Sequence, residues 1–261
     1  MAPLERRGRA LVRKPGLELE RCALTFVERR GIDVARARAQ HAAYVAALER
    51  AGWEVTHLPR MPDHADATFV EDAAVVLPEL AVIPRMGDDR RRAETDSVRA
   101  ALAGLRPVFE LKPPTTLDGG DVLVVESVVY VGQSRRTNHA GLKALAHELF
   151  EHGYATKAVE VLGCLHLKTA CTSLGGDRVL ANPRWIDPHR MRGIELVEAH
   201  PEEPFGANVL ALDDRVLVSA SHPRTNEGLA RLGYNVEALE LDELEKAEAG
   251  ITCLGILVPD L

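Results

Sequence analysis

The chain has 261 residues, of which 46% are hydrophobic and 27% are charged, a composition typical of a folded globular protein. Its formal net charge of −7 argues against a nucleic-acid partner, because proteins that bind polyanions are usually basic. No apolar run reaches the roughly 18 residues that a membrane helix needs, and the arginine-rich start lacks the apolar core of a secretory signal. Four cysteines without CxxC or zinc-ligand spacing favour reduced thiols and a cytoplasmic location.

From the N-terminus onward, one pattern recurs: two short runs rich in β-branched residues, a helical stretch, and one more strand. The pattern predicts a strand in 9–15, a helix in 33–52 and a strand in 53–59, and then four hairpins, in 73–85, 121–132, 165–183 and 208–220. Helices and strands follow three of these hairpins, with helices in 93–105, 135–153 and 224–234 and strands in 107–112, 154–162 and 235–241. The helix after the third hairpin, 185–193, is short and contains proline, and the run 252–259 ends the series.

These segments make five units of strand–strand–helix–strand, with the run 252–259 and the strand in 9–15 completing one unit together. A unit of this size cannot bury both faces alone, so the copies must pack on one another. Sharing a unit between the first and last strands closes the array and leaves little exposed sheet edge. We therefore predict an α/β fold in one catalytic domain, 1–261: a five-bladed propeller with pseudo-fivefold symmetry. Paired strands before each helix argue against a doubly wound parallel sheet.

Polar residues recur at the junction before each hairpin. Asp72, Asp118, His166, Asn208 and Cys253 follow one another at steps of 46, 48, 42 and 45 residues. In a ring, equivalent positions meet at one end of the axis, so this spacing predicts that these side chains are neighbours in space.

Thiol, imidazole and carboxylate groups at one site are the components of nucleophilic catalysis. A thiol needs activation, which a nearby imidazolium supplies, and the histidine needs a carboxylate to hold its ring. Each residue also has a structural interpretation: an acid in a turn, a histidine in the core, or a buried cysteine.

The remaining charges suggest a substrate. Further carboxylates could clamp a guanidinium through paired hydrogen bonds. The sequence Arg-Thr-Asn opens two helices, at 136–138 and 224–226, where an arginine could bind a carboxylate or the motif could serve only as a helix cap. A ligand with a guanidinium at one end and a carboxylate at the other is an arginine derivative.

Five motifs in register resemble the dimethylarginine dimethylaminohydrolase family, a group of guanidino-modifying enzymes of the pentein fold. They are FVED (69–72), LDGGDV (117–122), SRRTN (134–138), LHLK (165–168) and ITC (251–253). The resemblance implies that Cys253 is the nucleophile, that His166 is the general acid and base, and that Asp118 orients His166. It implies that the substrate is bound by Asp72, Asp66, Glu71, Arg91, Arg136, Leu24 on a lid, and Ala247. Three consecutive arginines, 90–92, leave open which of them faces the ligand.

The resemblance implies hydrolysis of an Nω-methylated arginine to citrulline and a methylamine through a covalent thiouronium on Cys253. No cofactor or metal is expected, because a zinc ion on the thiol and imidazole would block the nucleophile. Arginine deiminase, amidinotransferase and a non-catalytic binding protein of the same fold are the alternatives. The first two usually carry an acid two residues after the catalytic histidine, where this chain has Lys168. A homodimer is compatible with the sequence, which does not fix the oligomeric state.

Overall fold

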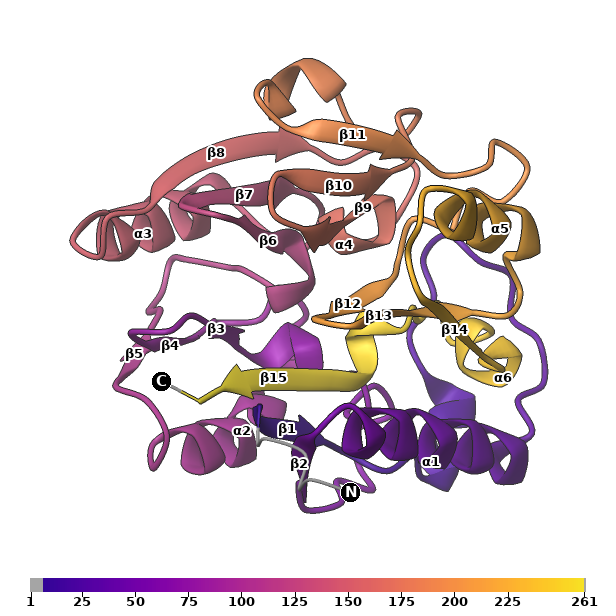
Figure 1. Cartoon of the computed structure of the whole chain (residues 1–261). Helices are drawn as coiled ribbons and strands as arrows, with labels where there is room; N and C mark the ends of the chain where they lie inside the picture. Colours follow the sequence, from indigo (N-terminus) through magenta and orange to yellow (C-terminus); the bar gives the residue numbers. More distant parts are fainter. Residues whose placement is uncertain (1–6, 261) are drawn as a thin grey trace.

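The computed structural model describes residues 7–260, and over this range the chain forms five three-stranded sheets (Figure 1). In every sheet the middle strand pairs antiparallel with one neighbour and parallel with the other. Four sheets are continuous in sequence: β3 (Val75–Val76), β4 (Ala81–Ile83) and β5 (Val108–Glu110); β6 (Val122–Val125), β7 (Val128–Gln133) and β8 (Ala155–Glu160); β9 (Cys171–Gly175), β10 (Arg178–Ala181) and β11 (Glu195–Glu198); β12 (Leu210–Leu212), β13 (Arg215–Ser219) and β14 (Val236–Leu239).

The fifth sheet joins the two ends of the chain. It has the order β15–β1–β2, from β1 (Gly8–Val12), β2 (Trp53–His57) and β15 (Gly255–Pro259). In Figure 1, β15, in yellow, lies beside β1, in indigo. The first strands of neighbouring units contact one another, β3 with β15, β6 with β9, and β9 with β12. The sheets are therefore arranged around an axis lined by these first strands, and the predicted pairing of the chain's ends is present.

Four units carry an α-helix between the middle and last strands, and these helices lie at the outside of the ring (Figure 1). They are α1 (Val34–Arg50), α2 (Thr95–Leu102), α3 (His139–Phe150) and α5 (Pro223–Arg231). The third unit has only the 3-10 turn η5 (Pro188–Met191) in this place. Asp187 caps that turn and Pro188 opens it, but the chain turns at Gly193, with φ +93°, before an α-helix can develop.

Five buried apolar clusters form the core of the described residues, and each combines residues of two neighbouring sheets with the outer element of one of them. In four units, a helix contributes to the cluster: α1 with Tyr44 and Leu48, α2 with Val98 and Leu102, and α3 and α5 in the same way. In the third unit, Met191 of η5 takes the place of the helix residues. Each outer element thus buries one apolar face, as the 3.6-residue periodicity predicts. No helix within residues 7–260 is long and apolar enough to cross a membrane.

Short helical turns occupy the connections and complete the secondary structure. They are η1 (Leu17–Arg21), η2 (Val70–Ala73), η3 (Asp89–Glu94), η4 (Gly119–Asp121), α4 (Leu167–Ala170), α6 (Asp242–Glu245) and η6 (Thr252–Leu254). Four of them, η2, η4, α4 and η6, lie directly before the first strand of a unit. A tight turn at this point directs the side chains beside it toward the axis.

Candidate active site

The junctions before the five hairpins come together, as their regular spacing predicts. η2 contacts both η4 and η6, and η4 contacts α4. Asp72 lies in η2, Asp118 and His166 are the N-caps of η4 and α4, and Cys253 lies in η6. Asn208, in the remaining junction, is hydrogen-bonded to the α4 and η6 segments. Five segments far apart in sequence therefore form one polar centre.

The imidazole of His166 lies between two buried carboxylates. Its Nε2 is hydrogen-bonded to Asp118 Oδ2 at 3.0 Å, and its Nδ1 lies 3.6 Å from Asp72 Oδ1. Burial disfavours the imidazolium, but the charge of Asp72, the hydrogen bond to Asp118 and the charges of Asp121 and Asp118 together raise the pKa of His166 to about 9. In the same way, His166 and Arg91 overcome the effect of burial on Asp72 and lower its pKa to about 2. His166 is therefore a protonated acid at neutral pH.

Gly120 leaves room for this arrangement. A Cβ at this position would lie 2.6 Å from Asp72 Oδ1 and 2.8 Å from His166 Nδ1, closer than real side chains approach. The Gly120 amide also donates to Asp72 Oδ1 at 3.1 Å. The second glycine of the LDGGDV motif is thus required by the packing of the two charged side chains.

Asp118 is fully buried and held on both sides. Its Oδ1 accepts from the Gly87 amide at 2.8 Å, and its own amide donates to Thr137 Oγ1 at 3.2 Å. The guanidinium of Arg136 lies beside it, with Nη1 3.5 Å from Asp118 Oδ2. Nη1 is buried, and no hydrogen-bond acceptor for it exists among the described residues. Arg136 therefore has an unused donor next to His166, suited to a carboxylate ligand.

Of the three consecutive arginines, Arg91 faces the centre. Its side chain is buried, and all three guanidinium nitrogens donate within the protein, to Glu94, to Asp72 at 2.7 Å and to backbone carbonyls. Arg90 is exposed and pairs with Asp88, whereas Arg92 donates to the Met86 carbonyl. The open question of which arginine points inward is thus answered, and the bonding of Arg91 directs it toward Asp72 rather than toward a ligand carboxylate.

Cys253 lies partly exposed, whereas the other three cysteines are buried. Its Sγ accepts from the Gly250 amide at 3.4 Å. Burial, followed by the charges of Glu71 and Asp72, raises the pKa of the thiol, and the Gly250 amide and Lys168 act in the opposite direction. In the free protein the thiol stays protonated, and a cation bound beside it would favour the thiolate.

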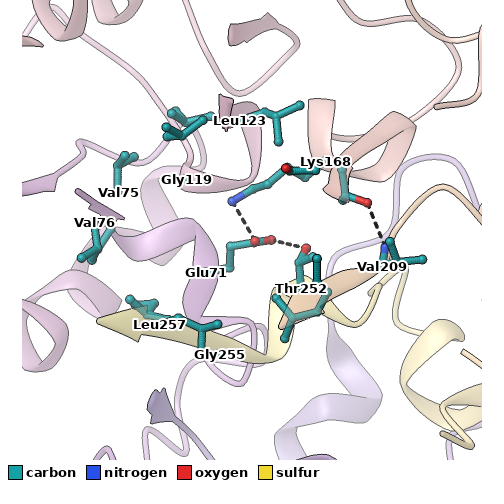
Figure 2. Close-up of a pocket in the computed structure, with 18 of the residues that line it drawn as sticks. Glu71, Val75, Val76, Gly119, Leu123, Lys168, Val209, Thr252, Gly255 and Leu257 are labelled. Atoms are coloured by element: carbon teal, nitrogen blue, oxygen red, sulfur yellow. Dashed lines mark hydrogen bonds and ion pairs between the residues drawn. The ribbon is translucent and has the colours of Figure 1, made fainter. Parts of the chain in front are cut away.

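Glu71 is engaged by its protein neighbours. Its two carboxylate oxygens bind Lys168 Nζ at 2.7 Å and the hydroxyl of Thr252 at 2.8 Å, as Figure 2 shows. These three residues form part of the wall of a cavity of about 390 Å³. Val75, Val76 and Leu257 line the same cavity, but Cys253 and the imidazole of His166 do not. The Glu71–Lys168 pair therefore forms the part of the cavity wall that lies next to the polar centre.

The segment around Leu24 is held by two carboxylates. The Ala23 amide donates to Asp66 at 3.1 Å, and the amides of Thr25 and Phe26 donate to Glu248 at 2.6 and 3.0 Å. Burial raises the pKa of both carboxylates. Leu24 therefore lies between two anchored peptide units, which is the arrangement expected of a closed lid.

Ala247, buried, directly precedes Glu248, and Glu248 itself has a left-handed backbone with φ +61°. Leu24, predicted to lie on a lid over the substrate, and Ala247, predicted to bind the substrate, thus come from two segments joined through Glu248. The sequence signals for Glu248 and for Glu94, the main partner of Arg91, are weak, because neither belongs to a motif and both act across folded loops.

A cation site is also conceivable from the geometry alone. One ligand atom each of Asp72, Asp118 and His166 lies within 4.8 Å of the others. A metal-binding histidine must be neutral, however, and these carboxylates hold His166 protonated, while Arg91 already occupies Asp72. The three residues are better suited to proton transfer than to metal binding.

Comparisons with known proteins place this geometry in a family. A sequence model described as arginine deiminase matches residues 59–203. The N(G),N(G)-dimethylarginine dimethylaminohydrolase of Streptomyces coelicolor is 40% identical, over 97% of this chain and 98% of the relative. The chain belongs to the dimethylarginine dimethylaminohydrolase family. The family's enzyme from Pseudomonas aeruginosa is 32% identical over 86% of this chain and 89% of its own length.

A solved structure from the family has the same fold. The Pseudomonas aeruginosa enzyme, as a cysteine-to-serine variant complexed with citrulline, has a TM-score of 0.89 and covers 97% of this chain and 99% of its own. Its sequence identity in this comparison is 30%. The predicted α/β fold of five ββαβ units and the predicted family are therefore confirmed.

Proposed function

We propose that this protein hydrolyses Nω-methylated arginine at the guanidinium carbon, releasing citrulline and a methylamine. The relatives bear the name of that activity, and one solved relative is complexed with citrulline. The observation that carries the proposal is the buried His166, which two carboxylates keep protonated at neutral pH. An alkylamine is a very poor leaving group unless it receives a proton as the C–N bond breaks, and His166 is the acid that supplies it.

Burial and the charges of Glu71 and Asp72 disfavour the thiolate in the free protein. The reaction begins when the substrate cation binds beside Cys253 and stabilises the thiolate, whose proton leaves to solvent. The thiolate attacks the guanidinium carbon, forming a C–S bond. His166 protonates the methylamine nitrogen, the C–N bond breaks, and a thiouronium remains on Cys253. Neutral His166 then takes a proton from water, and the hydroxide attacks the same carbon. The C–S bond breaks to give the thiolate and citrulline, and the proton on the added oxygen leaves to solvent.

The substrate would be held at both ends. Asp72, with Glu71 beside it, and Asp66 form the acidic side that accepts the guanidinium, although Glu71 and Asp66 also bind protein neighbours. Arg136 has a donor without a partner among the described residues and would bind the α-carboxylate. Arg91 holds Asp72 in place by a 2.7 Å ion pair. Leu24 and Ala247 would cover the bound ligand.

The test is to incubate the protein with asymmetric dimethylarginine, monomethylarginine and free arginine and to assay citrulline, with the Cys253→Ser variant as control. The proposal expects product from the methylated substrates with the wild type only. Product mainly from free arginine would favour an arginine deiminase. Product from no guanidine would favour a binding protein.

Lys168 bears on the first of these alternatives, because it stands where deiminases and amidinotransferases usually carry an acid. Its ammonium pairs with Glu71 at 2.7 Å, so position 168 contributes a positive charge rather than the carboxylate that would grip the two unsubstituted nitrogens of free arginine. We further propose that the chain is one catalytic domain, that it acts in the cytoplasm, where its four free thiols would stay reduced, and that it forms homodimers. Light scattering would detect a dimer as a particle of twice the mass of the chain.

A further inference from the structure

Asn208 occupies the junction position that corresponds to His166 and Cys253 in their units, yet the reaction above gives it no role. Its side chain is buried, with 5% of its surface exposed. The Nδ2 group donates to the backbone carbonyl of Lys168 at 2.7 Å and to Thr252 Oγ1 at 3.0 Å, and Oδ1 accepts from the Thr252 amide at 3.1 Å. The side-chain amide of Asn208 therefore bonds to two different segments, through both its NH₂ group and its oxygen.

The two segments are those of the proposed acid and nucleophile. Lys168 is two residues after His166, and Thr252 immediately precedes Cys253. The Thr252 hydroxyl receives a hydrogen bond from Asn208 and donates one to Glu71, the neighbour of Asp72 in sequence. The Asn208 amide therefore donates to the Thr252 hydroxyl, and that hydroxyl donates to the Glu71 carboxylate, so every donor in this chain of hydrogen bonds has an acceptor.

The backbone is shaped to fit this side chain. A Cβ at Gly250 would lie 2.3 Å from Asn208 Cγ, so only glycine allows the Asn208 amide to pack against this loop. The Gly250 amide in turn donates to the Cys253 sulfur. The loop that carries the Cys253 thiol therefore packs against Asn208 at Gly250 and is hydrogen-bonded to Asn208 at Thr252.

We propose that Asn208 is a positioning residue that fixes the Cys253 loop relative to the His166 segment. This inference rests on the proposed function and deepens it. The nucleophile and the acid must both face the same carbon atom, and the two come from separate blades of the ring. Asn208 bonds directly to both of their segments, and two of its three hydrogen bonds are to the backbone of those segments. A displacement of about 1 Å in such a geometry costs on the order of 100-fold in rate.

The test is the Asn208→Leu variant, which keeps the size of the side chain and removes its three hydrogen bonds. Asn182→Leu is the matched control, because Asn182 is equally buried and donates to the Pro204 carbonyl at 3.1 Å, outside the catalytic segments. With methylated arginine, Asn208→Leu should lower kcat by about 10- to 100-fold and change KM by less than about threefold. Asn182→Leu should leave kcat within about twofold.

Hydrogen exchange supplies a readout that needs no turnover. In Asn208→Leu the Thr252 amide loses its acceptor, so its exchange in a peptide covering 250–254 should accelerate at least about tenfold, while peptides of β6 and β7 exchange as in the wild type. If the wild type makes no citrulline, the proposed function fails, and the exchange result still decides whether Asn208 fixes the loop. Unchanged kcat or unchanged exchange in a folded Asn208→Leu protein overturns the inference.

A second pair of variants covers the case in which Asn208→Leu does not fold. Thr252→Val removes the hydroxyl that joins Asn208 to Glu71, and Thr252→Ser keeps it. Thr252→Val should lower kcat at least about tenfold, and Thr252→Ser should restore it to within about threefold of the wild type. Equal activity of the two variants would overturn the positioning role.

Discussion

The charge on His166 can be tested by replacing Asp118 with asparagine, which changes the charge of one carboxylate and keeps its shape. The Gly87 amide donates to Oδ1 of Asp118 at 2.8 Å, so the oxygen of the new amide will keep this contact. The NH₂ group then faces Nε2 of His166, where Asp118 now accepts at 3.0 Å. An NH₂ group can only donate, so it fits the unprotonated ring and destabilises the imidazolium.

The magnitude follows from the pKa of His166, which is raised from 6.5 to about 9. A difference of that size corresponds to about 3 kcal/mol in favour of the charged ring, at about 1.4 kcal/mol per pH unit. Asp72, Asp118 and Asp121 share this effect, and Asp118 contributes both a charge and a hydrogen bond, so its replacement should lower the pKa of His166 by about 1 to 2 units. The alkaline limb of the kcat/KM profile should move to lower pH by the same amount.

The assay is an NMR titration of the His166 ring in the Cys253→Ser background, with the resonance assigned by its loss in a His166 variant. Asp88→Asn is the control, because Asp88 binds Arg90 and lies 3.9 Å from Arg136 without contacting His166. That control should leave the titration unchanged. A His166 pKa that stays near 9 in Asp118→Asn would refute the assignment of the charge to this carboxylate.

The same pKa makes stability depend on pH. The folded pKa of His166 is raised above its unfolded value of 6.5, so the stabilisation is fully present below pH 6.5 and is lost as the pH rises through 9. We expect the free energy of unfolding, measured in urea, to fall by up to about 3 kcal/mol across that window in the wild type. The fall should be clearly smaller in Asp118→Asn, and an equal fall in both proteins would contradict the explanation.

Two further substitutions test the supports of the site. Glu248→Gln replaces one of the oxygens that accept from the Thr25 and Phe26 amides, so these amides should exchange at least about threefold faster and KM should rise; unchanged exchange would show that the lid is held elsewhere. Arg91→Met leaves the buried carboxylates of Asp72 and Glu94 without the Arg91 cation and should lower the free energy of unfolding in urea by about 3–5 kcal/mol. The control is Arg90→Met at the exposed neighbouring residue, which should change that free energy by less than about 0.5 kcal/mol.

Periodicity was sufficient to predict the fold because the blades repeat the same sequence pattern of two strands, a helical stretch and a third strand. Hairpins such as 121–132 alternate β-branched residues, and helices such as 135–153 carry an apolar stripe and end in glycine. The helix expected in 185–193 is the weak case, and it forms a 3-10 turn because proline and glycine lie too close together for an α-helix. Strand lengths were less predictable, since β3 has only two residues before the chain turns at Pro78.

The meeting of the junctions was also predictable from the sequence, because blades of similar length bring equivalent positions together. Their pairing was not. Thr252 and Glu71 are 181 residues apart and meet only when the ring closes. Lys168 stood out in the sequence as a departure from the deiminase pattern, but only the structure shows that it neutralises Glu71. Spacing predicts which junctions meet and says nothing about which charges cancel there.

The charges left unpaired at this centre point to the nature of its ligand. Asp66 and Glu248 are largely buried, and both bind backbone amides of the lid without an ion-pair partner among residues 7–260. Burial raises the pKa of both of these carboxylates, and burial together with the charges of Glu71 and Asp72 raises the pKa of the Cys253 thiol. Under the proposed function, a guanidinium bound beside Cys253 offsets the charges of Glu71 and Asp72 and favours the thiolate. A neutral urea lacks that effect, which favours release of citrulline after the reaction.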